Sequence, residues 1–362
     1  MSKLILIEEK SGQREIALME DNRLLSFCRE EGGHVEAEQI YLGAADRMVR
    51  GVEAAFVRLG GGQTGFLPFS ECREKPRSGE KMLVQVKKSP AGDKAPYLTR
   101  DISLAGRYAV YTPLSSGCAV SKRIADGALR ERLWETARRL RPPEGGLVMR
   151  LESAGAPEAD IAAEIAALRA KWAALQARAA GMAAPGLVEG RMDALSRLMR
   201  DEHGAIEKIL TDSPEALTDV PLPAEACDHP FALFGVRAKL EKSLQRKVWL
   251  DCGGYLVVDR TEAMTVIDVN SGKFVGGKSG AESTFLQLNR EAAKEIARLL
   301  RLRNIGGIVI VDFVDMQAEE SRAAVTEEME RALSGDPVKT VVHGFTALGL
   351  MELTRKKTEE SQ

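Results

Sequence analysis

Short apolar runs separated by polar turns follow one another through about the first hundred residues. Three of them predict strands near residues 4–7, 15–18 and 24–27. Residues 39–103 predict five more strands, at 40–43, 54–59, 65–68, 82–86 and 96–99. Glycine-rich turns such as Gly60–Gly62 separate these five strands. Short strands joined by glycine turns are typical of a small barrel of the OB type.

From residue 104 onward, helical periodicity alternates with apolar runs. Helices are predicted at 128–141 and 157–180, with strands at 108–111 and 147–150. Residues 191–250 have a mixed, mainly helical pattern. The remainder predicts a hairpin (254–259 and 264–269), a helix (283–304) closed by Gly306 and Gly307, and a strand ending at residue 312. This pattern indicates a multidomain chain of the mixed α/β class, because 362 residues exceed one ordinary core.

Two of the predicted strands end in acidic residues. Asp268 and Asp312 each follow a β-branched apolar run, and Asn270 comes two residues after the first. An unpaired carboxylate in a buried strand is strongly disfavoured, and two side by side repel each other, which a divalent cation relieves. A set of oxygen ligands favours Mg²⁺, or Mn²⁺, over zinc. The residues alone leave a second interpretation open, in which backbone donors or nearby arginines satisfy the acids.

The composition, with 44% hydrophobic and 29% charged residues, is typical of a soluble globular protein. No apolar stretch approaches the roughly 20 residues of a membrane span, and the amino terminus turns acidic too soon for a secretory signal. The five cysteines are scattered without a Cys-x-x-Cys pair. We therefore expect a cytoplasmic protein with reduced thiols, and neither a disulfide framework nor a zinc site.

The net charge of −2 argues against a uniformly basic nucleic-acid binder, but the charge is unevenly distributed. Residues 73–100 contain eight basic and three acidic residues, a net charge of +5. Phe56 and Phe66 precede this segment within the predicted barrel. Rings that stack on bases, next to cations that bind phosphates, predict a groove for single-stranded RNA. A solvated basic face and two core phenylalanines remain the alternative interpretation.

Longer motifs resemble the ribonuclease E/G family over almost the whole chain. They are Ala54-Ala-Phe56, Gly65-Phe-Leu-Pro68, Ile102-Ser-Leu-Ala-Gly-Arg-Tyr108, Ile267-Asp-Val-Asn-Ser-Gly272, Asn289-Arg-Glu-Ala-Ala293, Arg301-Leu-Arg303 and Asp312-Phe-Val-Asp-Met316. The resemblance implies an OB-fold RNA-binding barrel (39–103), a 5′-sensor α/β domain (104–190) and a deoxyribonuclease-I-like catalytic domain (253–362). It also implies a ribonuclease-H-like part at 191–252, which the amino-terminal strands of residues 1–38 join.

The resemblance further implies Mg²⁺-dependent cleavage of single-stranded, A/U-rich RNA in mRNA decay or rRNA processing. Asp268 and Asp312 match the family's metal-binding aspartates, and Asn270 matches its catalytic asparagine. Phe56, Phe66, Lys88 and Lys94 match residues that grip RNA. Mn²⁺ is an alternative cation, and zinc is not expected. The partner is single-stranded RNA and not a membrane. A homodimer fits the family, but zinc-linked assembly is not expected, because the sequence ends at Gln362, before the family's Cys-Pro-x-Cys segment and carboxy-terminal tail.

Four positions depart from the family's usual pattern. The 5′-end pocket keeps Gly106, Val110 and Arg150, but Lys122 replaces an arginine and Leu151 a threonine, so we expect a weakened pocket. Near the expected catalytic centre, Asn304 replaces an aspartate and Ala347 an arginine. These two losses keep a second hypothesis open, an RNA-binding paralogue with weak or no cleavage.

Overall fold

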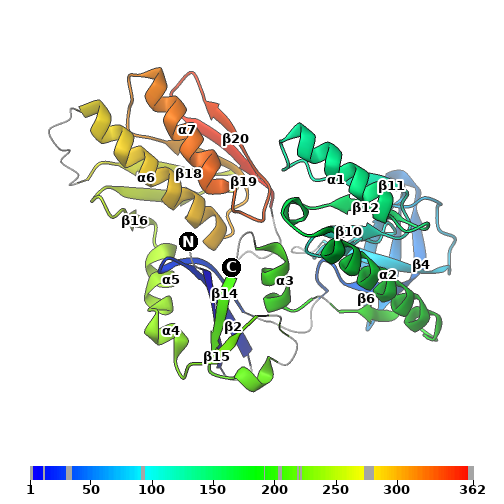
Figure 1. Ribbon diagram of the computed structural model, residues 1–362. Helices are drawn as coiled ribbons and strands as arrows, with labels where there is room; N and C mark the ends of the chain where they lie inside the picture. The colour runs from blue at the N-terminus through cyan, green and yellow to red at the C-terminus, as the bar shows by residue number, and fades with distance from the viewer. Residues whose placement is uncertain are drawn as a thin grey trace. The chain divides into compact units, whose positions relative to one another are not determined.

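The computed structural model shows a mixed α/β chain that divides into two compact units, Gly32–Asp193 and Met1–Glu31 with Ala194–Gln362 (Figure 1). The structure describes residues 3–10, 13–29, 35–90, 94–190, 192–202, 206–217, 220, 222–272 and 281–357. None of the helices in these ranges combines the length and the low polarity that a membrane crossing requires.

The smaller unit contains a closed barrel of five strands, as the sequence predicted. Its strands, in the order in which they pair, are β4 (Ile40–Val49), β5 (Ala54–Gly60), β6 (Gln63–Pro68), β8 (Tyr97–Thr99) and β7 (Lys81–Lys88). Pairing of β7 with β4 closes the barrel, and β13 (Gly186–Glu189) adds to β4 outside it. The turn between β5 and β6 needs glycine, because Gly61 and Gly62 have φ angles of 57° and 78°. The barrel is OB-like.

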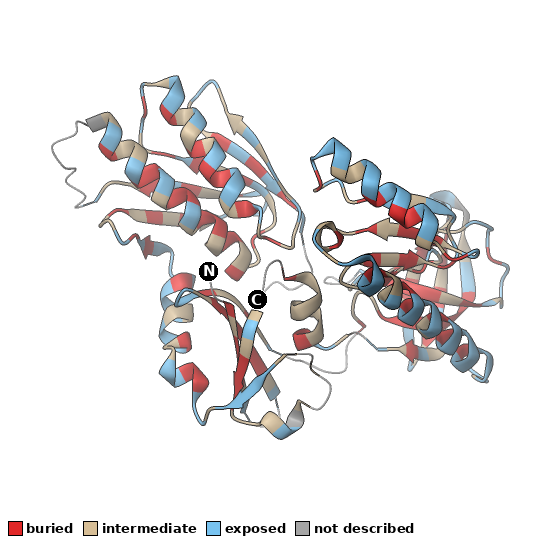
Figure 2. Cartoon of the chain, in the orientation of Figure 1, coloured by how far each residue is buried: buried red, intermediate tan, exposed pale blue. Residues whose placement is uncertain are grey.

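A second sheet in the same unit packs against two helices. Its strands, in spatial order, are β11 (Gly117–Val120), β12 (Gly146–Met149), β10 (Ala109–Thr112) and β9 (Leu104–Ala105). The helices are α1 (Gly127–Leu140) and α2 (Glu158–Ala180). Helix α2 is rich in alanine but packs against the sheet through a buried stripe that runs from Ile161 through Leu168 and Trp172 to Leu175. Figure 2 shows this stripe beside the exposed side of α2.

The first sheet of the larger unit joins distant parts of the sequence. Its strands, in spatial order, are β15 (Ala224–Ala226), β14 (Ile206–Thr211), β1 (Lys3–Lys10), β2 (Gln13–Glu20) and β3 (Arg23–Arg29). The helices α3 (Ala194–Asp201), α4 (Pro230–Leu233) and α5 (Val236–Leu244) accompany it. The mixed, mainly helical prediction for residues 191–250 missed β14, which pairs in parallel with β1.

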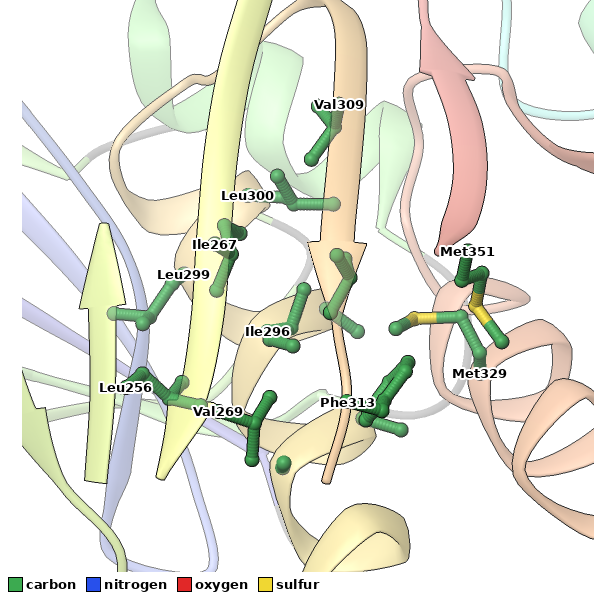
Figure 3. Packing of buried hydrophobic residues seen from close by; sticks show 14 of the residues in the cluster. Leu256, Ile267, Val269, Ile296, Leu299, Leu300, Val309, Phe313, Met329 and Met351 are labelled. Atoms are coloured by element: carbon green, nitrogen blue, oxygen red, sulfur yellow. The ribbon is translucent and has the colours of Figure 1, made fainter. Parts of the chain in front are cut away.

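The second sheet of this unit positions the acidic residues. Its strands, in spatial order, are β16 (Lys247–Trp249), β17 (Tyr255–Arg260), β18 (Met264–Asn270), β19 (Gly307–Asp312), β21 (Met351–Arg355) and β20 (Thr340–Phe345). The helices α6 (Ala281–Leu302) and α7 (Glu319–Leu333) lie side by side against it (Figure 1). Figure 3 shows Ile267, Leu300 and Val309 meeting in the core between the sheet and the helices.

The end of α6 differs from the prediction. The helix stops at Leu302, and Asn304 takes the left-handed conformation (φ 47°) expected of Gly306 and Gly307. The side chain of Asn304 accepts a hydrogen bond from Arg355, whose guanidinium also pairs with the buried Asp336 at 2.7 Å. Asn304 lies before the start of β19, whereas Asp312 is its last residue. The strand is about 17–20 Å long, so the expectation that Asn304 lies near the catalytic centre is wrong.

Candidate active site and RNA-binding surfaces

Asp268 and Asp312 lie opposite each other on neighbouring strands. Strands β18 and β19 run parallel, and their register pairs Asp268 with Asp312. Neighbouring strands are about 4.8 Å apart, so the two carboxylates leave the sheet side by side. The crossover through α6 brings the two strands together, as in a βαβ unit. The register thus places side by side the two acidic residues that the sequence assigned to separate strands.

Both carboxylates point to the face of the sheet that α6 and α7 leave open. Their neighbours Ile267, Val269 and Val311 are buried in the core, and side chains alternate between the faces of a strand. Asp268 and Asp312 are exposed. The expectation of fully buried strands is therefore wrong, since these strands are buried on one face only. Their apolar runs do not reveal this, because several residues on the open face are also apolar.

The electrostatics of the pair favour a bound cation. Partial desolvation at the sheet surface, followed by the negative charges of Asp268 and Asp315, raises the pKa of Asp312 above its ordinary value. The amide of Asn270 donates to Asp268 Oδ2 at 2.7 Å, which fixes one oxygen of that carboxylate. Among the described residues, no lysine or arginine pairs with either aspartate.

The donor set suits a hard divalent ion. Two adjacent carboxylates and one amide supply only oxygen ligands from protein side chains, as Mg²⁺ prefers, and substrate and water oxygens complete such sites. Within the described residues, histidine, cysteine, aspartate and glutamate side chains form no group of three or more that could hold a metal. The pair therefore fits an ion that the protein binds through few ligands.

The backbone after Asp312 is held by two residues of α6 to which the sequence analysis assigned no role, although it listed Asn289 in a family motif. Asn289 of α6 is fully buried, and its amide group both donates to the Val314 carbonyl (2.7 Å) and accepts from the Val314 N–H (3.2 Å). Glu282, also of α6, accepts from the N–H groups of Gln317 and Ala318. These contacts fix the segment that follows β19, and thereby the position of Asp312 at the end of the strand. The signal available in the sequence was a polar residue, Asn289, on the apolar side of a helix.

Ala347 lies at the same end of the sheet as Asp312. It is an exposed residue of the turn between β20 and β21, and Met351 just beyond it pairs with Val311. Of the two departures assigned to the catalytic centre, only Ala347 is therefore near it.

On the barrel, three aromatic rings form a row across neighbouring strands. Phe56 pairs with Phe66, and Phe66 pairs with Tyr97. The ring centroids are 5.8 Å apart in the first pair and 6.2 Å in the second. All three rings are partly exposed, whereas the alternate residues Val57 and Leu67 fill the core. The two phenylalanines are thus on the outer face of the barrel, and we call the three rings the aromatic row.

Cations border the aromatic row, but the basic patch is smaller than the sequence indicated. The Arg47 guanidinium lies 5.3 Å from the Phe56 ring, and Lys88 Nζ lies 5.8 Å from the Tyr97 ring. Lys94 is exposed three residues before Tyr97. Other cations of the segment are paired with acids, in Lys75–Glu53, Lys87–Glu71 and Arg100–Glu80. Tyr97 and Arg47 were missed, because only strand pairing shows that they adjoin the phenylalanines.

The residues expected at the 5′-end pocket gather at one end of the second sheet. Strands β11 and β12 are parallel, so Lys122 and Arg150 both follow the same end of the sheet. Arg150 donates to the Gly106 carbonyl at 2.5 Å, and Val110 belongs to the neighbouring β10. Lys122 is exposed, whereas Leu151 is half-buried and packs against the core. The leucine side chain thus contributes to packing and offers no donor to a phosphate.

Glu164 of α2 holds the loop that follows Gly106. Its carboxylate accepts the backbone N–H groups of Arg107 (2.6 Å), Tyr108 (2.8 Å) and Ala109 (2.9 Å). A side chain at Gly106 would meet this carboxylate at 2.4 Å, so the close approach requires glycine. The sequence analysis missed Glu164, because it belongs to a helix that showed no functional pattern.

Comparison with known proteins agrees with the resemblance seen in the motifs. The model of the Ribonuclease E/G family matches residues 103–358. Ribonuclease G of Escherichia coli (strain K12) is 38% identical over 91% of this chain and 76% of the relative. Ribonuclease G of Haemophilus influenzae is 35% identical over 99% of this chain and 80% of the relative. Ribonuclease E of Nostoc sp. is 35% identical over 99% of this chain and 56% of the relative. The chain therefore belongs to the Ribonuclease E/G family, a family of endoribonucleases.

Proposed function

We propose that this chain is a Mg²⁺-dependent endoribonuclease that cleaves single-stranded, A/U-rich RNA in RNA processing or decay. The main support is the parallel register that sets Asp268 beside Asp312 on an open sheet face. Family membership supports the same reaction. The test is cleavage of a short, single-stranded A/U-rich oligonucleotide with and without Mg²⁺. Absence of Mg²⁺-dependent cleavage, with RNA binding retained, would contradict the enzymatic proposal and favour the RNA-binding paralogue.

In this proposal Asp268 and Asp312 hold the metal ion. When bound, Mg²⁺ polarises the scissile phosphate and lowers the pKa of a water molecule. Asn270 keeps one oxygen of Asp268 in a fixed direction through its 2.7 Å hydrogen bond. Asn289 acts as a positioning residue, because it holds Val314 and thereby the strand exit that presents Asp312. Mn²⁺ has similar ligand preferences and is the alternative ion.

The finer assignment of the domains is part of the same proposal. The barrel would be the RNA-binding module and the sheet of β9–β12 the 5′ sensor. The sheet of β1–β3, β14 and β15 would be the ribonuclease-H-like part, and the sheet with α6 and α7 the deoxyribonuclease-I-like catalytic part. A cytoplasmic location agrees with the five cysteines, all of which are free thiols. A homodimer is compatible with the proposal, which does not require zinc.

The second hypothesis, a binding protein with weak cleavage, is supported by Ala347 alone. This position lies at the same end of the sheet as Asp312 but has no cation. If a missing positive charge limits the reaction, Ala347→Arg should raise the cleavage rate at unchanged RNA affinity. Ala347→Gln is the matched control, since it adds length without charge.

The aromatic row should contribute much of the affinity for RNA. Phe56→Ala and Phe66→Ala should each weaken single-strand binding by about 1–3 kcal/mol, the range measured for base stacking on aromatic rings. Lys88 and Lys94 would contact phosphates beside the rings. The measurement is the dissociation constant for an A/U-rich oligonucleotide, combined with a thermal melt of each variant.

Leu98, which lies inside the barrel, provides the comparison for these variants. Leu98→Ala should lower the melting temperature, because it leaves a cavity in the core. If Phe56→Ala and Phe66→Ala instead behave like Leu98→Ala, with a lowered melting temperature and unchanged affinity in the folded protein, the rings serve packing only.

The 5′-end pocket should discriminate poorly between 5′ ends. Leu151 cannot donate a hydrogen bond to a terminal phosphate, and such a bond to a charged acceptor contributes about 1.5–3 kcal/mol. Lys122 also lacks the planar fork of an arginine. We expect the cleavage rates of 5′-monophosphorylated and 5′-hydroxyl oligonucleotides of equal sequence to differ by less than about tenfold.

Leu151→Thr is the matched variant for this prediction, since it restores the hydroxyl and should increase the preference for the monophosphate. A preference well above tenfold in the unmodified chain would show that Arg150 and the loop held by Glu164 are sufficient.

A further inference from the structure

We propose that Lys247, Trp249 and Tyr255 form a nucleotide-binding subsite, which stacks a base of single-stranded RNA beside the scissile phosphate. This inference rests on the proposed function and adds a substrate contact within the sheet that holds the carboxylates. We call the three residues the Trp249 cluster.

The Trp249 cluster shares a face of the sheet with the carboxylates. Trp249 on β16 pairs with Tyr255 on β17, and Tyr255 pairs with Asn270 on β18. Their chain neighbours Val248, Leu256 and Val269 are buried in the core on the side of α6. Because side chains alternate between the two faces of a strand, Trp249, Tyr255 and Asn270 point to the open face.

The cluster is also at the same end of that face as the candidate metal site. Two residues along these strands, a second set of cross-strand pairs runs across the sheet. In it Lys247 pairs with Val257, Val257 with Asp268, and Asp268 with Asp312. Strands β16 and β18 are two spacings apart, which is about 10 Å. A base on the cluster would therefore belong to a nucleotide close to the phosphate at Asp268 and Asp312.

The composition of the cluster matches a single-strand site. Trp249 is 56% exposed, and its ring centroid lies 5.2 Å from that of Tyr255. Lys247 Nζ lies 4.3 Å from the Trp249 centroid and 3.6 Å from the Tyr255 centroid. In the described part of the chain, no carboxylate pairs with Lys247. Exposed rings offer a stacking surface for any base, and the adjacent ammonium group offers a contact for a phosphate.

The turn between β16 and β17 holds the cluster in place. Leu250 is buried, its N–H donates to the Gly254 carbonyl, and its own carbonyl accepts from Gly253. The Cys252 N–H donates to Glu291 of α6 at 3.1 Å. The turn is thereby attached to the same helix that fixes the exit of β19. A ring held in advance loses little conformational freedom when a base stacks on it.

The test is a binding and crosslinking experiment in the Asp312→Asn background, in which we expect no cleavage of the RNA. The probe is a short A/U-rich oligonucleotide that contains 4-thiouridine, and crosslinked peptides are identified by mass spectrometry. We expect a crosslink at Trp249 or Tyr255. Trp249→Ala should remove it and weaken binding between about fivefold and about a hundredfold, while Trp249→Phe should keep part of both.

Trp134 of α1 provides a matched control, because it is another exposed tryptophan (43%) with a cation, Arg138, 4.9 Å from its ring. Trp134→Ala should leave binding and crosslinking unchanged. Equal losses in both alanine variants, or no loss in Trp249→Ala with an unchanged melting temperature, would overturn the proposal. A changed sedimentation coefficient of Trp249→Ala with unaltered RNA binding would also overturn it, by assigning the surface to a protein contact.

Failure of the inference can be distinguished from failure of the proposed function. If the unmodified chain neither binds the A/U-rich oligonucleotide nor cleaves it in Mg²⁺, the proposed function itself is wrong. If the aromatic row affects binding but the Trp249 cluster does not, only this inference is wrong.

Discussion

Asp268→Asn and Asp312→Asn should each abolish cleavage while leaving the fold and most of the RNA affinity intact. Each substitution removes one negative ligand from a site in which two carboxylates face each other in register. The loss of turnover should exceed about a hundredfold, because even residues that only support metal ligands contribute about 10- to 100-fold. The measurement is the single-turnover cleavage rate in Mg²⁺, beside the dissociation constant for the same RNA.

A metal titration separates the role of the ligand from other causes of inactivity. Mn²⁺ binding, followed by electron paramagnetic resonance without RNA, should weaken in both variants. Asp259→Asn is the matched control, since Asp259 lies on the open side of the neighbouring strand β17 but pairs with Arg246 at 2.5 Å. It should cleave normally. Turnover comparable to the unmodified chain in either Asp268→Asn or Asp312→Asn would refute the metal assignment.

Glu202→Gln should destabilise the larger unit by about 3–5 kcal/mol, the range for removing one partner of a buried ion pair. The Glu202 side chain is fully buried, where it accepts from Lys3 at 2.5 Å and pairs with Arg301 of α6. Without the carboxylate, both cations lose their ion pair with Glu202, although Lys3 keeps a longer pair with Glu20 at 3.7 Å. The measurement is the free energy of unfolding from urea titrations. Asp259→Asn, which breaks a solvent-exposed pair, should leave the free energy of unfolding nearly unchanged.

The same contact predicts a pH dependence. Burial would raise the pKa of Glu202, but Arg301 and Lys3 outweigh it and hold the pKa below the ordinary value of 4.5. A lowered pKa in the folded state means that the stabilisation is complete above pH 4.5 and is lost as the pH falls below that value. The difference in stability between the unmodified chain and Glu202→Gln should therefore narrow on acidification. A constant difference down to strongly acidic pH would show that the carboxylate does not contribute as an ion.

The two phenylalanines of the barrel show that local sequence patterns predict only part of a binding site. Glycine turns and short apolar runs predicted the barrel strands, because turn conformation and alternation are properties of neighbouring residues. Whether Phe56 and Phe66 were core or surface was open, since both interpretations fit the same run. Strand pairing decided it by placing Val57 and Leu67 inside the barrel, and it added Tyr97 to the row.

The sequence by itself determined most of the types of element, the family, and the two acidic residues of strands β18 and β19 with Asn270. Only the tertiary structure decided that Asp268 lies opposite Asp312 and that both lie on an open face of the sheet. It also decided that Asn304 lies just after α6 and far from the two aspartates, and that Trp249 shares their face. The physical reason is that periodicity and turn chemistry act over a few residues. Strand register and facing depend on pairings between segments such as β1 and β14, which lie about two hundred residues apart.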